Sequence, residues 1–156
     1  MLTTAQYQTL KTAALADGTA AGYIETANDQ ALANWFNTPD AAYYVWRTAI
    51  QPSEYREAVV WTEVDALTVG KARIWEWITQ IMTMPIDASK TNVRQGIADC
   101  WASNTTTRAN LLTAAKRNAT RAEKLLATGA GTSGSPSVMG YEGNLSAAEA
   151  SLVRVA

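Results

Sequence analysis

The pair Gly70-Lys71 is a place where residue types could do chemistry, because Gly-Lys closes the phosphate-binding loop of many nucleotide-binding proteins. That loop also needs a glycine five residues before its second glycine and a Ser or Thr directly after the lysine. This sequence has Asp65 and Ala72 at those two positions, and no predicted strand precedes them. We therefore expect no nucleotide site in this segment.

Two carboxylate pairs, Glu54/Glu57 and Glu63/Asp65, are the other candidates for catalysis. Glycosidase chemistry needs two carboxyl groups in one cleft with unlike pKa values, whereas such spacings usually mark a solvated face. The chain has no histidine and one cysteine, Cys100, which excludes a Ser-His or Cys-His nucleophile and a structural zinc site. We expect no catalytic residue, no metal, no cofactor and no enzymatic activity.

The tryptophans Trp75 and Trp77 are candidates for packing or docking. Residues two apart on a helix face opposite sides, so Trp75 shares a face with Ile78 and Trp77 shares one with Ile74. A helix with large apolar groups on both sides is buried on both sides. The two covering layers are either parts of the same domain or this domain and a neighbouring chain, and on the second alternative both tryptophans lie at a subunit interface.

The elements that must position these residues are mostly helices. Apolar residues recur at helical spacing over 3–16, 29–36, 52–60, 70–83, 90–102 and 107–127. The run 41–50 stays open between a strand and a buried helix. The sequence thus predicts a mainly α fold, with a compact helical bundle as one domain over residues 1–127.

The predicted helix 107–127 carries a basic stripe formed by Arg117, Arg121 and Lys124. It contrasts with residues 1–65, where three cations face eight acids. A solvated face and phosphate contacts of a small helical nucleic-acid-binding protein are alternatives. We favour contacts with the acidic half of another copy, because opposite charges on one chain suit head-to-tail association into rings.

Residues 128–156 form a second predicted region. Five of the nine glycines and Pro136 lie between 128 and 144, which excludes a regular helix. We expect an extended C-terminal arm that docks on a partner through Pro136, Val138, Met139, Tyr141 and Leu145, with disorder in the isolated protein. Ser146 and Glu149 form a capping-box pattern, so a short terminal helix or strand is expected after the arm.

The N-terminal residues lack the basic and long apolar runs of a signal peptide, and no apolar run approaches the roughly 20 residues of a membrane span. We therefore expect a protein that is made in a cytoplasm and has no membrane partner. The charged fraction of 17%, combined with six tryptophans and six tyrosines, favours a surface that other protein chains partly cover, and a well-packed monomer with large core residues is the alternative.

Several segments together resemble a family of small structural proteins from the head and neck of tailed bacteriophages. They read WTEVDALTVGKARIWEWI (61–78), NVRQGI (92–97), TRANLLTAAKR (107–117), RAEKLLATGAGT (121–132) and YEG (141–143). Within that class the sequence looks most like a head–tail connector, or adaptor. The resemblance brings no catalytic or ligand-binding motif.

The resemblance implies a helical virion protein, made in the host bacterial cytoplasm, that forms a homo-oligomeric and often dodecameric ring in the neck. Such a ring joins the portal protein to tail or neck proteins and leaves a channel through which DNA passes without sequence-specific binding. Another virion structural protein, from the tail or the capsid surface, remains an alternative.

Overall fold

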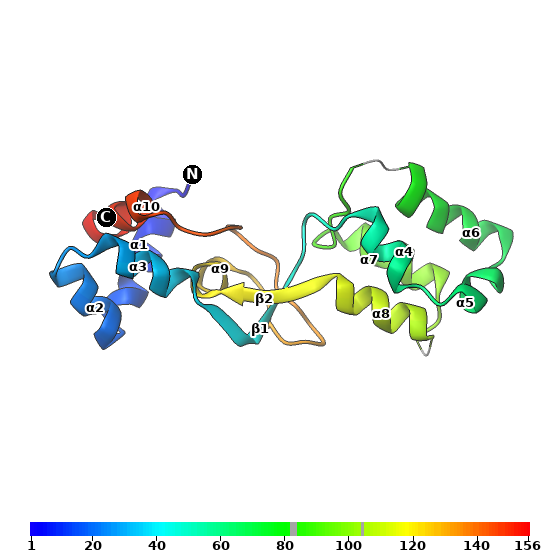
Figure 1. Ribbon diagram of the computed structural model, residues 1–156, viewed down its shortest axis with the longest axis horizontal. Helices are drawn as coiled ribbons and strands as arrows, with labels where there is room; N and C mark the ends of the chain where they lie inside the picture. The colour runs from blue at the N-terminus through cyan, green and yellow to red at the C-terminus, as the bar shows by residue number, and fades with distance from the viewer. Residues whose placement is uncertain (82–83, 104) are drawn as a thin grey trace. The chain divides into compact units, whose positions relative to one another are not determined.

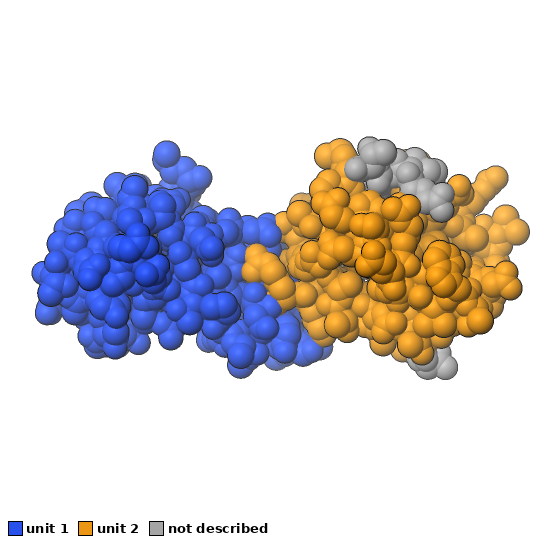
Figure 2. Space-filling model, in the orientation of Figure 1, with its two compact units in different colours: residues 1–45, 118–156 blue, residues 46–117 orange. Residues whose placement is uncertain are grey.

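The computed structural model describes residues 1–81, 84–103 and 105–156, and these residues are mainly α-helical, as predicted. They form two compact units with separate hydrophobic cores (Figure 2). Unit 1 combines Met1–Val45 with Asn118–Ala156, and unit 2 is Trp46–Arg117. This division differs from the expected boundary at residue 127, because the second half of unit 1 returns from beyond an insertion.

Unit 1 is built around the predicted N-terminal helix and the terminal helix (Figure 1). Thr3 and Gln6 make a capping box at the start of the first helix, and Asp17 caps the second helix. Leu10, Phe36 and Val153 are fully buried in the shared core. The helices of unit 1 are α1 (Thr4–Leu15), α2 (Gly18–Glu25), α3 (Asp29–Asn37), α9 (Arg121–Leu126) and α10 (Ala147–Val155).

The ambiguous run 41–50 contributes to a strand, β1 (Pro39–Trp46), which pairs with β2 (Lys116–Thr120). Arg121 N donates to Thr38 O at one end of the pair, and Arg47 N donates to Ala115 O at the other end. The start of β1 therefore lies beside the end of β2, so the two strands are antiparallel. Adjacent aromatic and β-branched residues in 43–46 favour a strand once a partner is present.

The predicted helix 107–127 is wrong as a continuous element. It is divided into α8 (Thr106–Ala114), β2 and α9. Asn118 and Thr120 are weak helix formers, and the Asn118 side chain donates to the Ala41 carbonyl across the strand pair (3.0 Å). Thr120 and Glu123 then form a capping box, which begins a new helix. Tertiary pairing with β1 outweighs the helical pattern.

The extended arm expected over 128–156 is not confirmed, because this segment packs on unit 1. Ser137 forms a parallel bridge to Val45, and Val138 forms an antiparallel bridge to Thr128. The Asn37 side chain donates to the Leu145 carbonyl (2.8 Å) and accepts from the Leu145 N–H (2.7 Å). The predicted terminal helix is confirmed as α10, with the Ser146–Glu149 capping box in place.

The buried carboxylate of Glu123 fixes the same segment to α9. It accepts hydrogen bonds from Thr120 N (2.9 Å) and from Gly143 N (3.0 Å). Two backbone donors thereby satisfy a charged group that would be costly to bury alone. The end of the chain is therefore a structural part of unit 1.

Unit 2 contains short helices packed around aromatic residues. Trp75 lies between Tyr55, whose ring stacks at 6.4 Å, and Trp101, whose ring meets it edge-on at 4.7 Å. The predicted helix 70–83 begins as an α-helix and continues as a π-helix to Ile81, and its last two residues lie outside the described residues. The helices are α4 (Pro52–Ala58), α5 (Trp61–Asp65), α6 (Val69–Glu76), η1 (Trp77–Ile81), α7 (Thr91–Cys100) and α8.

Candidate protein-binding surface

A largely apolar cavity lies in unit 2, lined by residues of α6, η1 and α7. It has a volume of about 520 Å³ and is open to solvent. We call it the Trp77 groove. Its lining residues are Arg73, Ile74, Trp77, Ile78, Asn92, Val93 and Gly96.

Gly96 lines the groove from α7. A Cβ atom built at Gly96 would lie 3.4 Å from Ile78 Cδ1 and 3.7 Å from Ile74 Cγ2. Both distances are those of ordinary van der Waals contact, so an alanine would fit at this position without a shift. A longer side chain at Gly96 would extend into the groove that this residue lines.

The two tryptophans have opposite environments, which corrects the expectation of a helix buried on both sides. Trp75 is 6% exposed and belongs to the core of unit 2, whereas Trp77 is 61% exposed. Ile74, on the Trp77 side, is also exposed. Of the two alternatives for the second layer, cover by the same domain is therefore wrong for Trp77.

The predicted basic stripe does not form on one helix. Arg117 lies in β2 and belongs to unit 2, whereas Arg121 and Lys124 lie on α9 in unit 1. The Arg121 guanidinium sits 4.7 Å from the centre of the Trp35 ring. Arg121 and Lys124 therefore make contacts within their own unit, contrary to a role as an uncovered cationic stripe.

Lys124 forms an ion pair with Asp40 (2.7 Å), and this hydrogen bond lowers the pKa of Asp40 below its ordinary value. The Lys124 ammonium also lies 5.4 Å from the centre of the Tyr43 ring. A cavity of about 270 Å³ at this place is lined by Asp17 and Asp40 as well as by Arg121 and Lys124. Two carboxylates beside the two cations make this cavity a poor site for phosphate.

The five expected docking residues of the arm are mostly used inside unit 1. Pro136 and Leu145 are buried, and Met139 and Tyr141 are partly buried. Val138 alone among these five is exposed. A packed segment with one exposed apolar residue does not form the free docking element that the sequence predicted.

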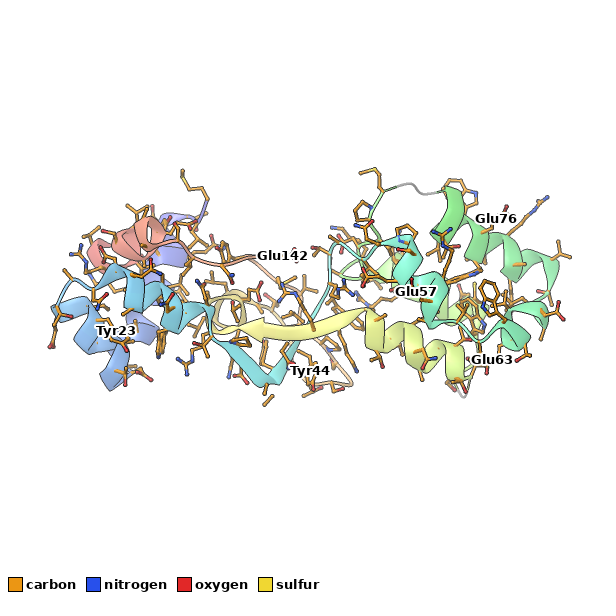
Figure 3. All side chains as sticks on the ribbon, in the orientation of Figure 1. Tyr23, Tyr44, Glu57, Glu63, Glu76 and Glu142 are labelled. Atoms are coloured by element: carbon orange, nitrogen blue, oxygen red, sulfur yellow. The ribbon has the colours of Figure 1, made fainter. Side chains whose placement is uncertain are left out.

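Glu54 and Glu63, one member of each carboxylate pair, make structural contacts in unit 2. Glu54 pairs with Arg47 (2.7 Å), and this hydrogen bond lowers the pKa of Glu54. The side-chain hydrogen bond of Thr107 is the main cause that lowers the pKa of Glu63, and the backbone N–H of Thr107 adds to it. Glu63 thus accepts a hydrogen bond from the first turn of α8. Figure 3 shows Glu57 and Glu63 on α4 and α5. A catalytic acid needs a raised pKa, so both shifts have the wrong direction for that role.

Within residues 1–81, 84–103 and 105–156, no three or more His, Cys, Asp or Glu side chains lie close enough to hold a metal ion. Burial raises the pKa of the Cys100 thiol, which indicates a packing role rather than a reactive one. None of the helices described is both long and apolar enough to cross a membrane.

Sequence analysis missed two parts of the apolar surface. Val93 and Gly96 complete the groove from α7, and only the unusual glycine within a helical pattern pointed to them. Leu152 and Val155 are exposed on α10, and their spacing of three residues was visible. Comparisons with protein-family models, with curated proteins and with solved structures find no match to this chain.

Proposed function

We propose that this chain is a non-catalytic structural subunit of a tailed-phage virion, which assembles into a ring in the neck and joins the portal to the tail. The resemblance of its sequence segments to phage head and neck proteins supports the location. The apolar surface of unit 2 supports a function in protein assembly. DNA would pass through the ring, where the net charge of −1 gives the chain no overall attraction for phosphate.

The exposure of Trp77 is the observation that carries the assembly function. A tryptophan side chain that is 61% exposed leaves roughly 150 Å² in contact with water, or about 3–4 kcal/mol at roughly 25 cal/mol per Å². Ile74 and Val93 extend the same surface into a groove. Tryptophan is enriched among the residues that contribute most to protein association, so this surface has the composition of an interface.

Imaging of purified virions tests the location. We expect density for this chain as a closed ring between portal and tail. Density on the capsid surface or along the tail would replace the adaptor function with another virion structural role. Absence of the chain from purified virions would overturn the proposal.

The nucleic-acid-binding alternative has a separate test. If Arg117, Arg121 and Lys124 contacted phosphates, the purified protein would bind DNA with a strong salt dependence, and charge reversal at these residues would abolish binding. We expect no such binding, since Arg121 and Lys124 already contact Trp35 and Asp40. Salt-dependent binding that charge reversal removes would favour the alternative over the adaptor.

A further inference from the structure

A second apolar surface lies on α10, at the other unit of the chain. Ala148, Leu152 and Val155 are exposed, and they follow the spacing i, i+4 and i+7. Leu152 is 47% exposed and Val155 is 64% exposed. We call these three residues the α10 ridge. Their spacing is that of helices that bind into apolar grooves of other proteins.

The ridge is held rigidly on its own unit. On the opposite face of α10, Ala150 and Val153 are fully buried in the core of unit 1. Arg154 on α10 donates to Asp29 on α3 (2.8 Å), which fixes the rotation of the helix. A fixed helix loses little conformational entropy on binding, which favours its use as a docking element.

The charges of the two units are complementary. Unit 1, which carries the ridge, has four cationic and seven acidic residues, whereas unit 2, which carries the groove, has nine cationic and seven acidic residues. Arg73 adds a cation to the lining of the groove. An acidic unit and a basic unit attract each other, and two units of the same kind repel.

We propose that the α10 ridge of one copy binds in the Trp77 groove of the next copy. Trp77, Leu152 and Val155 are each exposed among the described residues of their own unit. The contact would join two different surfaces and would therefore repeat from copy to copy, closing into a ring where the rotation allows. This inference rests on the proposed function of a ring-forming subunit and names the residues that link its copies.

Complementary variants of the full chain test the contact. Leu152→Asp combined with Val155→Asp places charges on the ridge and leaves the groove intact. Gly96→Met fills the groove and leaves the ridge intact, and Trp77→Ala removes one wall of the groove as a second groove variant. Gly96→Ala, which adds a single methyl group, and Val138→Asp, which charges an exposed apolar position away from the ridge, are the matched controls.

Sedimentation velocity would measure association, with circular dichroism to show that each variant keeps its helices. We expect the wild type and Val138→Asp to assemble, and the ridge and groove variants to associate at least roughly 30-fold more weakly. When the ridge variant is mixed with Gly96→Met, one intact ridge meets one intact groove. The mixture should then form a one-to-one dimer that does not grow further.

Three outcomes would overturn the inference. A ridge variant that assembles as the wild type does, while Trp77→Ala does not, shows that something other than α10 occupies the groove. A mixture that forms no dimer shows that the two surfaces do not meet. A wild-type chain that stays monomeric at every concentration shows that the copies do not bind each other. Virion imaging tests the proposed function separately. If the ridge variant still forms an intact ring in the neck, the ridge–groove contact is wrong but the proposed function is retained.

Discussion

Trp75 and Trp77 are separated by one residue, but Trp75 is buried and Trp77 is exposed. Trp75 contacts Tyr55 and Trp101 in the core of unit 2. Trp77 opens the π-helix and lines the groove. Residues two apart on a helix point to nearly opposite sides, so one short segment both stabilises the unit and supplies its apolar surface.

The two tryptophans are therefore expected to differ in their effect on stability. Trp75→Ala should lower the free energy of unfolding of unit 2 by about 3–5 kcal/mol, because it leaves a cavity among buried aromatic rings. Trp77→Ala should change it by less than about 1 kcal/mol, since little of that side chain is packed. Urea unfolding followed by circular dichroism, at a concentration where the chain is monomeric, measures both values. Equal losses would contradict the assignment of Trp75 to the core and Trp77 to the surface.

At the scale of elements, α10 connects the end of the chain to α3 and α1. Arg154 pairs with Asp29 on α3, and the Lys11 ammonium on α1 donates to the Ala156 carbonyl (2.9 Å). Val153 and Ala150 fill the core between them. These contacts join residues more than one hundred positions apart, so α10 completes unit 1 rather than extending from it.

The Asp29–Arg154 pair should make the stability of unit 1 depend on pH. The hydrogen bond from Arg154 holds the pKa of Asp29 below its ordinary value of 3.8. A carboxylate with a lowered pKa stabilises the fold above its unfolded pKa and loses that contribution as pH falls through the folded value. We expect the urea concentration at the unfolding midpoint of unit 1 to decrease as the pH is lowered below about 4. In Asp29→Asn this decrease should be less steep.

Glu25→Gln, which alters an exposed acid of the same unit, is the control for that measurement. Its pH profile should match the wild type. A wild-type profile that Asp29→Asn does not change would show that other carboxylates dominate the acid response of unit 1.

Local patterns predicted many of the elements, and long-range pairing decided the rest. The capping box at Ser146 indicated α10, because a cap involves residues only three positions apart. The helix over 107–127 was predicted wrongly, because β2 depends on β1, about seventy residues earlier in the chain. Trp77 was a candidate from the sequence, whereas its groove also needs Val93 and Gly96 of α7, and their proximity to Trp77 depends on tertiary packing that no local pattern specifies.

At the scale of the whole molecule, the chain forms two cores that share no residue. Unit 1 centres on residues such as Leu10, Phe36 and Val153, and unit 2 centres on Tyr55, Trp75 and others. Unit 2 is an insertion between Val45 and Asn118. Each unit has its own apolar interior, so each has its own source of stability.

Matched substitutions in the two cores should therefore act on one unit at a time. Leu10→Ala and Leu111→Ala each remove a fully buried leucine and are expected to cost about 2–5 kcal/mol. Hydrogen exchange read on peptides should show faster exchange in residues 1–45 and 118–156 for Leu10→Ala, and in residues 46–117 for Leu111→Ala. Equal acceleration in both units after either substitution would show a single cooperative structure.

The insertion also sets an order of events during synthesis. A ribosome releases α1, α2 and α3 before the inserted segment, but α10, which covers their apolar side, leaves it only after that segment. Unit 2 is fully synthesised once residue 117 has been added, so it can fold before α10 is available to complete unit 1. A nascent chain that stops early would thus carry one finished unit and one unfinished unit, with Leu10 and Phe36 open to chaperones and proteases.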